Sequence, residues 1–219
     1  LKNVFDLKPN KRKLYIYESS SLRIKKITRD YYKDNDYLNS LWFGAKMAKY
    51  IFVAGGVISG TGKGVSAASI GLLLRSRGHN VTLIKFDPYL NTDAGVLAPR
   101  EHGECFLCDD GTETDLDLGH YERIAGINVS KLNICTSGNL YEELIAEQKR
   151  GDYLGETIQV VPHVTNKIEK RLLKLGENHD IVIAEVGGTV GDNESDPFFE
   201  AISKFRLRNS KNVLMVLVA

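Results

Sequence analysis

Residues 50–64 read Tyr-Ile-Phe-Val-Ala-Gly-Gly-Val-Ile-Ser-Gly-Thr-Gly-Lys-Gly. The run starts with apolar, β-prone side chains up to Ala54, becomes glycine-rich at Gly55, and is followed after Lys63 by apolar residues that continue to Gly78. This order predicts a buried strand, a glycine-rich loop and a helix that stops at a glycine. Backbone N–H groups and the helix dipole bind phosphate in such a loop, and its lysine reaches the outer phosphates. We therefore expect a phosphate-binding loop at this point.

The loop departs from the strict pattern G-x-x-x-x-G-K-[ST] at two positions. Val57 stands at the first glycine, and Gly64 stands where a serine or threonine hydroxyl would bind Mg²⁺. A nucleotide bound here would need other ligands for its metal ion. The alternative interpretation is a glycine-rich connection that only packs a helix on a strand.

Further apolar runs place this loop in an α/β fold. We predict strands at residues 80–86, 181–186 and 213–218, and helices at residues 166–175 and 194–204. Continuous apolar strands, that of 213–218 included, are expected when helices cover both faces of a parallel sheet. The predicted architecture is therefore P-loop NTPase-like, with a mostly parallel sheet and helices on both faces.

Residues 87–162 form a stretch much longer than the usual connection between a strand and a helix. It is rich in glycine and acidic residues, and helices are predicted at residues 118–124 and 140–149. Long connections of this kind are usually functional, so we interpret it as a functional insertion.

Two carboxylates are candidates for binding Mg²⁺, which prefers oxygen ligands. Asp117 lies in the insertion, and Glu185 lies at the end of a predicted strand, where ligands of such sheets bind. The alternative for Asp117 is a charge that stabilises a helix N-terminus. Lys85 lies within another apolar strand and needs an anionic partner, which is either a phosphate or the carboxylate of a buried ion pair.

The composition excludes several classes of protein. With 42% hydrophobic residues, 26% charged residues and 5 prolines, the chain is near the average for globular proteins. No apolar run is long enough to span a bilayer, and the N-terminus lacks the features of a secretory signal. The 3 cysteines suggest no disulfide framework, and the single Cys-x-x-Cys pair is a weak metal or redox signal. We expect a cytoplasmic protein without a membrane partner.

The first 46 residues differ from the rest, with 11 Lys or Arg against 5 Asp or Glu, which leaves 18 against 23 for the remainder. A new pattern begins at Met47, which runs directly into the first strand. We interpret residues 1–46 as a basic N-terminal extension of uncertain status. They contain no recognisable nucleic-acid motif, so we expect no nucleic-acid partner.

The chain from Lys49 to about Ile202 closely resembles the N-terminal synthetase (amidoligase) domain of CTP synthase. The resemblance rests on seven blocks of sequence, at residues 50–64, 85–91, 101–104, 113–123, 150–155, 159–165 and 185–192. The most specific of them are Lys-Phe-Asp-Pro-Tyr-Leu-Asn at 85–91 and Glu-Thr-Asp-Leu-Asp-Leu-Gly-His-Tyr-Glu-Arg at 113–123. On this resemblance residues 47–219 are expected to be a partial synthetase domain that lacks the family's glutaminase domain.

The resemblance implies a ligase that aminates UTP to CTP in pyrimidine nucleotide synthesis and depends on ATP and Mg²⁺. ATP phosphorylates the uracil O4, and ammonia, released by the glutaminase domain, then displaces that phosphate at C4. CTP is expected as a feedback inhibitor, and a homo-oligomer, tetrameric in the intact family, is expected as the assembly. The alternative is a catalytically inactive assembly or regulatory fragment of the same family. A generic P-loop ATPase would explain only the glycine loop and the carboxylates.

The resemblance also assigns roles to individual residues. Lys63 and Lys85 are expected to act in catalysis, and Asp117 and Glu185 to hold Mg²⁺. The ATP site is expected to comprise Gly60, Thr61, Gly62, Lys63, Gly64, Val65 and Asp117. The UTP or CTP site is expected to comprise Ser59, Gln159, Asp192, Asn193 and Glu194. His102 and Cys105 match positions beside the ammonia route.

Some positions depart from the family pattern. Asn193 and Asp196 replace apolar residues and bring new polarity next to the expected nucleotide site. Ala54 and Cys105 are milder changes of size and polarity that we expect to be tolerated.

Overall fold

The computed structural model describes residues 14–16, 25–27, 47–56, 60–92 and 97–219. The chain divides into two units, Leu1–Lys46 and Met47–Ala219. In the first unit, β1 (Leu14–Ile16) and β2 (Lys25–Ile27) pair in antiparallel orientation. The candidate site lies in the second unit, which is described from here on.

A five-stranded sheet forms the centre of the second unit, in the order β7-β4-β8-β3-β9. Its strands are β3 (Lys49–Gly55), β4 (Val81–Asp87), β7 (Ile134–Thr136), β8 (Ile181–Val186) and β9 (Val213–Val218). Every neighbouring pair is parallel. The prediction of an α/β fold with a mostly parallel sheet is therefore confirmed.

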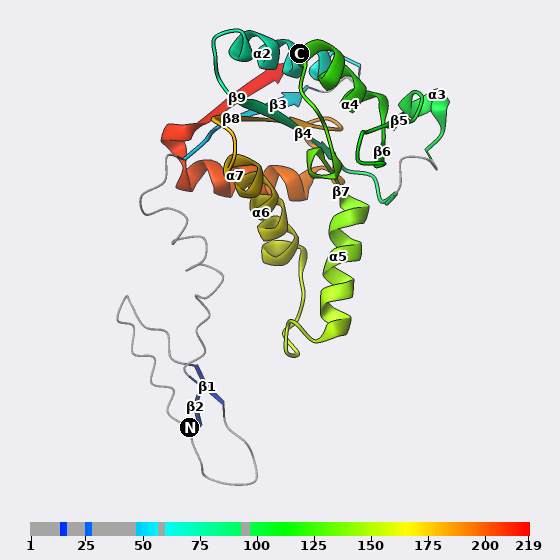
Figure 1. Cartoon of the computed structure of the whole chain (residues 1–219). Coiled ribbons are helices and arrows are strands. Elements are labelled where there is room, and N and C mark those ends of the chain that lie inside the picture. The colour runs from blue at the N-terminus through cyan, green and yellow to red at the C-terminus, as the bar shows by residue number, and fades with distance from the viewer. Residues whose placement is uncertain (1–13, 17–24, 28–46, 57–59, 93–96) are drawn as a thin grey trace. The chain divides into compact units, whose positions relative to one another are not determined.

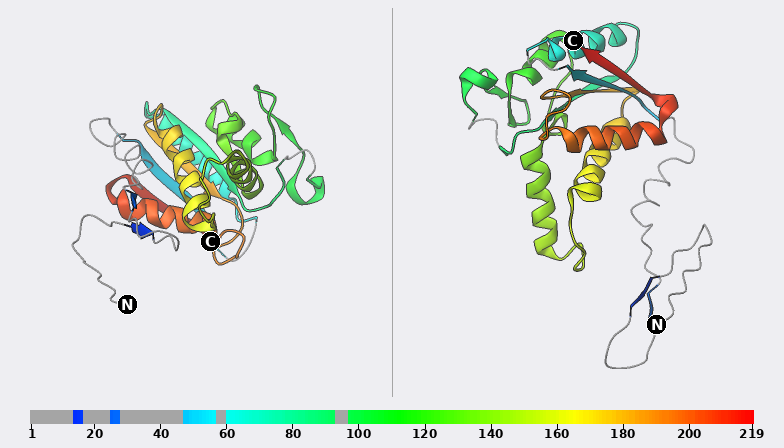
Figure 2. Two further views of the ribbon diagram at one scale, coloured as in Figure 1. Left: turned by 90° about the horizontal axis from the view of Figure 1, so that it is seen from below. Right: turned by 180° about the vertical axis from the view of Figure 1, so that it is seen from behind.

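Helices cover both faces of this sheet (Figures 1 and 2). One face packs against α2 (Lys63–Arg75), α4 (Leu116–His120) and the π-helical turn η2 (Tyr121–Ala125). The other packs against α5 (Ser137–Arg150), α6 (Thr165–Gly176) and α7 (Asp196–Arg208). Because successive side chains of a strand point to opposite faces, Phe52 belongs to the second core and its neighbour Val53 to the first.

Local sequence explains where the helices begin and end. Gly62 precedes α2 with a φ of +84°, a left-handed conformation that glycine adopts without strain. The Thr136 side chain accepts a hydrogen bond from the Asn139 N–H and caps α5, which ends at the left-handed Gly151. In α7, Pro197 occupies the first turn, where a missing N–H costs nothing.

The long stretch after β4 contains more structure than the sequence predicts. It holds the short helix α3 (Pro99–His102), the hairpin of β5 (Phe106–Leu107) and β6 (Glu113–Thr114), and two short helical turns, η3 (Lys131–Asn133) and η4 (Val160–Val164). The predicted helix at 118–124 is α4 continued by η2, and that at 140–149 lies within α5. Part of the stretch joins the main sheet, because β7 pairs with β4.

The strand β9, preceded by the turn η5 (Ser210–Asn212), differs from the expectation of helices over both of its faces. Leu214 and Leu217 are 57% and 64% exposed. β9 lies at the edge of the described sheet, beside β3 alone, and of its residues Val213, Val216 and Val218 are those that pack against the described cores. Among the described helices, none combines the length and apolar character needed to cross a membrane.

Candidate functional site

A pocket of about 680 Å³ opens where the carboxyl ends of β3, β4 and β8 meet the start of α2. This is the edge of an open parallel sheet at which ligands of α/β proteins bind. Its walls come from the glycine loop, the end of β4, the helix α4 and the loop after β8. The lining includes Gly60, Thr61, Gly62, Lys63, Gly64, Val65, Lys85, Asp87, Asp115, Asp117, His120, Glu185, Gly188, Asp192, Glu194 and Ser195.

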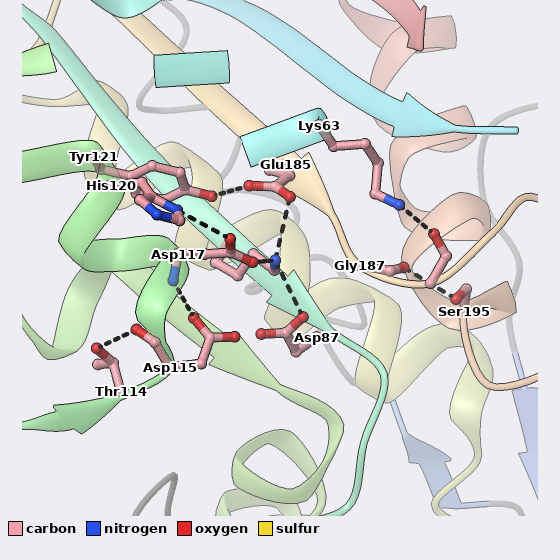
Figure 3. A network of polar contacts seen from close by, with 12 residues as sticks. Lys63, Asp87, Thr114, Asp115, Asp117, His120, Tyr121, Glu185, Gly187 and Ser195 are labelled. Atoms are coloured by element: carbon pink, nitrogen blue, oxygen red, sulfur yellow. Dashed lines mark hydrogen bonds and ion pairs between the residues drawn. The ribbon is translucent and has the colours of Figure 1, made fainter. Parts of the chain in front are cut away.

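Lys63 is the first residue of α2 and is 8% exposed. Its Nζ donates a hydrogen bond to the Gly188 carbonyl at 2.9 Å, so the side chain crosses from the glycine loop to the loop after β8 (Figure 3). Gly55 makes this path available, because a Cβ there would lie 2.7 Å from Lys63 Nζ. The sequence thus places a cation at the helix N-terminus, where phosphates bind.

Gly64, the second residue of α2, faces the two carboxylates that the sequence predicts as metal ligands. A Cβ on Gly64 would lie 3.0 Å from Asp117 Oδ1 and 3.3 Å from Glu185 Oε2. Two residues 68 positions apart in the chain therefore place oxygen atoms beside the start of the same helix. An oxygen pair of this kind suits Mg²⁺, which is usually held by one or two carboxylates together with phosphate oxygens.

Lys85 lies next to Glu185 in the register of β4 and β8 and is 5% exposed. Its ammonium contacts Asp117 Oδ2, lies 3.2 Å from Glu185 Oε1 and lies 3.7 Å from Asp87 Oδ1 (Figure 3). Burial alone would lower the pKa of Lys85, but the carboxylates of Asp87, Glu185 and Asp117 raise it well above its ordinary value. Lys85 is therefore a buried cation, and the ion-pair alternative raised by the sequence describes its contacts in this structure.

Asp117 and Asp87 respond in opposite ways to this shared environment. For Asp117, burial opposes ionisation, but the charge of Lys85 and its hydrogen bond lower the pKa below its ordinary value. For Asp87, burial outweighs Lys85, and the nearby Asp115 carboxylate adds to it, so the pKa is raised well above its ordinary value. Of these two carboxylates, Asp117 is thus the better stabilised in its charged form.

Two neighbouring side chains fix the orientation of the metal-ligand candidates. Tyr121, fully buried in η2, donates a hydrogen bond from its hydroxyl to Glu185 Oε2. Burial, with the charge of Glu185, raises the pKa of Tyr121 well above its ordinary value, so it stays a donor. Asp115 caps α4 by accepting a hydrogen bond from the Asp117 N–H at 3.0 Å. His120 Nδ1 lies 3.6 Å from Asp117 Oδ1, so each of the two carboxylates has a polar neighbour besides Lys85.

The loop after β8 is held by its own hydrogen bonds. The Thr189 hydroxyl and N–H donate to Asp192 Oδ2 at 2.6 and 3.0 Å, and these bonds lower the pKa of Asp192. The Ser195 hydroxyl, fully buried, donates to the Gly187 carbonyl at 3.3 Å. This loop forms part of the pocket wall, and Asp192, Glu194 and Ser195 are in the lining.

The structure gathers most of the predicted site residues, but not all of them. The predicted residues that line the pocket are Gly60, Thr61, Gly62, Lys63, Gly64, Val65, Lys85, Asp117, Glu185, Asp192 and Glu194. Asn193, Gln159 and Cys105 are exposed and lie outside its lining. Ser59 lies outside the described residues, and so does the side chain of His102.

Sequence reasoning missed Asp87, Asp115 and Tyr121 as parts of the site. Asp87 follows Lys85 by two positions, and Asp115 precedes Asp117 by two. Their closeness in sequence to predicted site residues could therefore have indicated both. Tyr121 gave no such signal, because a buried aromatic residue in a helix usually only packs in a core. Its contact with Glu185 depends on the fold.

Comparison with known proteins supports the resemblance read from the sequence. Residues 49–219 match a family model described as "CTP synthase N-terminus". The chain is 57% identical over 172 residues to CTP synthase of Rubrobacter xylanophilus, covering 78% of this chain and 31% of that protein. It is 57% identical over 162 residues to the CTP synthases of Geobacillus kaustophilus and Staphylococcus aureus, covering 73% of this chain and 30% of each. The chain thus spans about three tenths of the length of the curated relatives it matches.

Proposed function

This chain belongs to the CTP synthase family, and from that membership we propose that residues 47–219 form the nucleotide-binding part of an enzyme that converts UTP to CTP. The reaction uses ATP to phosphorylate the uracil O4 of UTP, and ammonia then displaces the phosphate at C4. The products are CTP, ADP and phosphate. In the intact enzyme, a glutaminase domain releases the ammonia from glutamine.

The observation that carries this proposal is the convergence of Lys63, Lys85, Asp117 and Glu185 at one edge of the parallel sheet. Two buried cations and two carboxylates around a helix N-terminus match the needs of phosphoryl transfer, in which the protein positions groups and stabilises charge. A glycine loop that only packed a helix on a strand would require none of these four side chains.

In this proposal the glycine loop from Gly60 to Val65 binds the ATP phosphates through its backbone N–H groups. Lys63 leaves the Gly188 carbonyl and stabilises charge on the phosphoryl group. Asp117 and Glu185 hold Mg²⁺, which neutralises charge on the phosphate oxygens when it is bound. Lys85 lies behind these carboxylates and acts near the reacting centre.

The pyrimidine nucleotide is proposed to lie along the loop after β8. Asp192 and Glu194 line the pocket there, which supports a role for them in binding UTP or the inhibitor CTP. Ser59, Gln159 and Asn193 stay proposed contacts on the family pattern alone. The ammonia route past His102 and Cys105, the homo-oligomeric assembly and the cytoplasmic location are proposed on the same basis.

The test is CTP formation by the purified chain from UTP, ATP, Mg²⁺ and ammonium chloride, with phosphate release measured in parallel. We expect CTP and phosphate in equal amounts, and loss of both in Lys63→Ala. Lys167→Ala is the matched control, because Lys167 is a half-buried lysine paired with Glu143 and Glu147 away from the pocket. ATP binding without CTP or UTP-dependent phosphate release would contradict the proposal for this chain. Nucleotide-stimulated assembly without phosphate release would support the inactive assembly module instead.

A further inference from the structure

In each of the carboxylates of Asp117 and Glu185, the two oxygen atoms have different neighbours. One oxygen of each, Asp117 Oδ2 and Glu185 Oε1, contacts the Lys85 ammonium. The other two, Asp117 Oδ1 and Glu185 Oε2, lie over Gly64, at 3.0 and 3.3 Å from the position of a Cβ. Lys85 therefore binds the pair from one side, and the remaining oxygens point to the start of α2.

Gly64 stands at a loop position that usually supplies a metal ligand. In the strict phosphate-loop pattern, this residue is a serine or threonine whose hydroxyl binds Mg²⁺. Here the space that such a side chain would occupy lies against two carboxylate oxygens. Each of these oxygens retains acceptor capacity, because a carboxylate offers about four lone-pair sites. Lys85 and Tyr121 use only part of them, and His120 Nδ1 lies 3.6 Å from Asp117 Oδ1.

We propose that Gly64 is a specificity-determining residue that transfers metal binding from the loop hydroxyl to the carboxylate pair, because its missing side chain admits Asp117 Oδ1 and Glu185 Oε2. The inference rests on the proposed function for the assignment of a metal–ATP complex to this pocket. Lys85 and Tyr121 act as positioning residues that hold the pair with these oxygens turned toward Gly64.

The space beside Gly64 and the contacts of the two carboxylates both oppose a side chain at this position. A Cβ within 3.0–3.3 Å of both oxygens leaves no room for a side chain unless a carboxylate moves by a few tenths of an ångström. Movement is resisted, because Asp117 is held by Lys85 and Glu185 by both Lys85 and Tyr121. Any side chain at position 64, with or without a hydroxyl, therefore displaces the metal ligands.

The experiment compares how tightly a non-hydrolysable ATP analogue binds with Mn²⁺ and with EDTA. The ratio of the two dissociation constants measures the contribution of the metal, and binding in EDTA reports on the phosphate loop alone. We expect Mn²⁺ to tighten binding at least tenfold in the wild type, and both Gly64→Ala and Gly64→Ser to lose most of this gain. The unchanged control is Gly71→Ala, which adds the same methyl to the same helix against the apolar side chains of Leu83 and Ala125.

The serine variant separates the two explanations. If a hydroxyl could serve as a metal ligand beside the two carboxylates, Gly64→Ser would keep the full Mn²⁺-dependent gain of the wild type, and that result would overturn the inference. Equal affinities for wild type and both variants would overturn it as well. Failure of the analogue to bind the wild type under either condition would instead contradict the proposed function, and with it the premise of the inference.

A ligand exchange keeps the inference testable if the single variants at Gly64 do not fold. Asp117→Ala removes one carboxylate and is expected to lose the Mn²⁺-dependent gain. The double variant Asp117→Ala with Gly64→Ser places a hydroxyl in the space that the carboxylate leaves. Partial recovery of the gain in the double variant supports the equivalence of the two positions, and no recovery overturns it.

Discussion

At the scale of single residues, the site is organised by one buried lysine. Lys85 pairs with three carboxylates, of Asp87, Asp117 and Glu185, and those of Asp87 and Glu185 are buried. A buried pair adds little stability over an apolar replacement, but removing one partner leaves a costly uncompensated charge. The stability of this region therefore depends on keeping the cation in place.

We predict that Lys85→Met lowers the free energy of unfolding by about 3–5 kcal/mol at pH 7. Without the lysine, the pKa values of its carboxyl partners rise in the folded state, so the folded protein takes up protons before the unfolded chain does. The loss of stability should therefore shrink as the pH falls toward 5. Urea unfolding of the variant at several pH values checks this. A loss independent of pH, or equal to that of Lys167→Met, would contradict it.

Residue-level prediction from sequence succeeded where chemistry demanded a partner. A lysine and a glutamate within continuous apolar strands needed counter-charges, and the structure places Lys85 and Glu185 side by side. The prediction was incomplete for contacts between residues that only the fold brings together. Neither the hydrogen bond from Tyr121 to Glu185 nor the approach of Gly64 to both carboxylates leaves a local pattern in the chain.

At the scale of elements, the helices α6 and α7 are joined by a polar contact beside their apolar one. Glu169 of α6 is 3% exposed, and its Oε1 accepts a hydrogen bond from Arg208 Nη2 of α7 at 2.6 Å. Burial raises the pKa of Glu169 above its ordinary value, although Arg208 lowers it in part. The carboxylate therefore costs stability when charged, and Arg208 reduces that cost.

We predict that Arg208→Ala destabilises the protein by about 1–2 kcal/mol at pH 7, because Arg208 is partly exposed and its loss removes the cation that is hydrogen-bonded to Glu169. The pKa of Glu169 then rises further. A carboxyl group whose pKa is raised in the folded state lowers the stability of the protein as the pH increases through that pKa. The loss of stability caused by Arg208→Ala should therefore diminish below about pH 5. Arg206→Ala, an exposed change on the same helix, is the control, and equal pH profiles for both variants would contradict the prediction.

Element boundaries followed from the sequence where the pattern was long. The strands at 181–186 and 213–218 are confirmed to the residue, because continuous apolar runs flanked by turns define both ends. The strand β7 was missed, since three residues carry too little pattern to be recognised. The hairpin of β5 and β6 was missed for the same reason.

At the scale of the whole second unit, β9 is the strand whose exposure the local sequence does not predict. Its composition is that of a buried strand, but burial depends on neighbours, and β3 is its only partner in the described sheet. Unpaired edge strands with apolar side chains are sites of association between chains.

We predict that the purified chain self-associates in a concentration-dependent manner, and that Leu214→Lys combined with Leu217→Lys reduces this association. Sedimentation velocity over a range of concentrations measures it. Leu207→Lys is the control, because Leu207 is 81% exposed but lies on α7 rather than on the sheet edge. A wild type that is monomeric at all concentrations, or a double variant that associates equally, would argue against this role for β9.

The proposed function depends on the pocket at the ends of β3, β4 and β8 binding the phosphates of ATP through Lys63. Its most direct test is thermal unfolding of the wild type and Lys63→Ala with Mg²⁺ and ATP, since a ligand that binds only the folded state raises the midpoint. We predict a rise in the wild type that grows with ATP concentration and is lost in Lys63→Ala. An equal rise in both proteins, or none in the wild type, would contradict this binding.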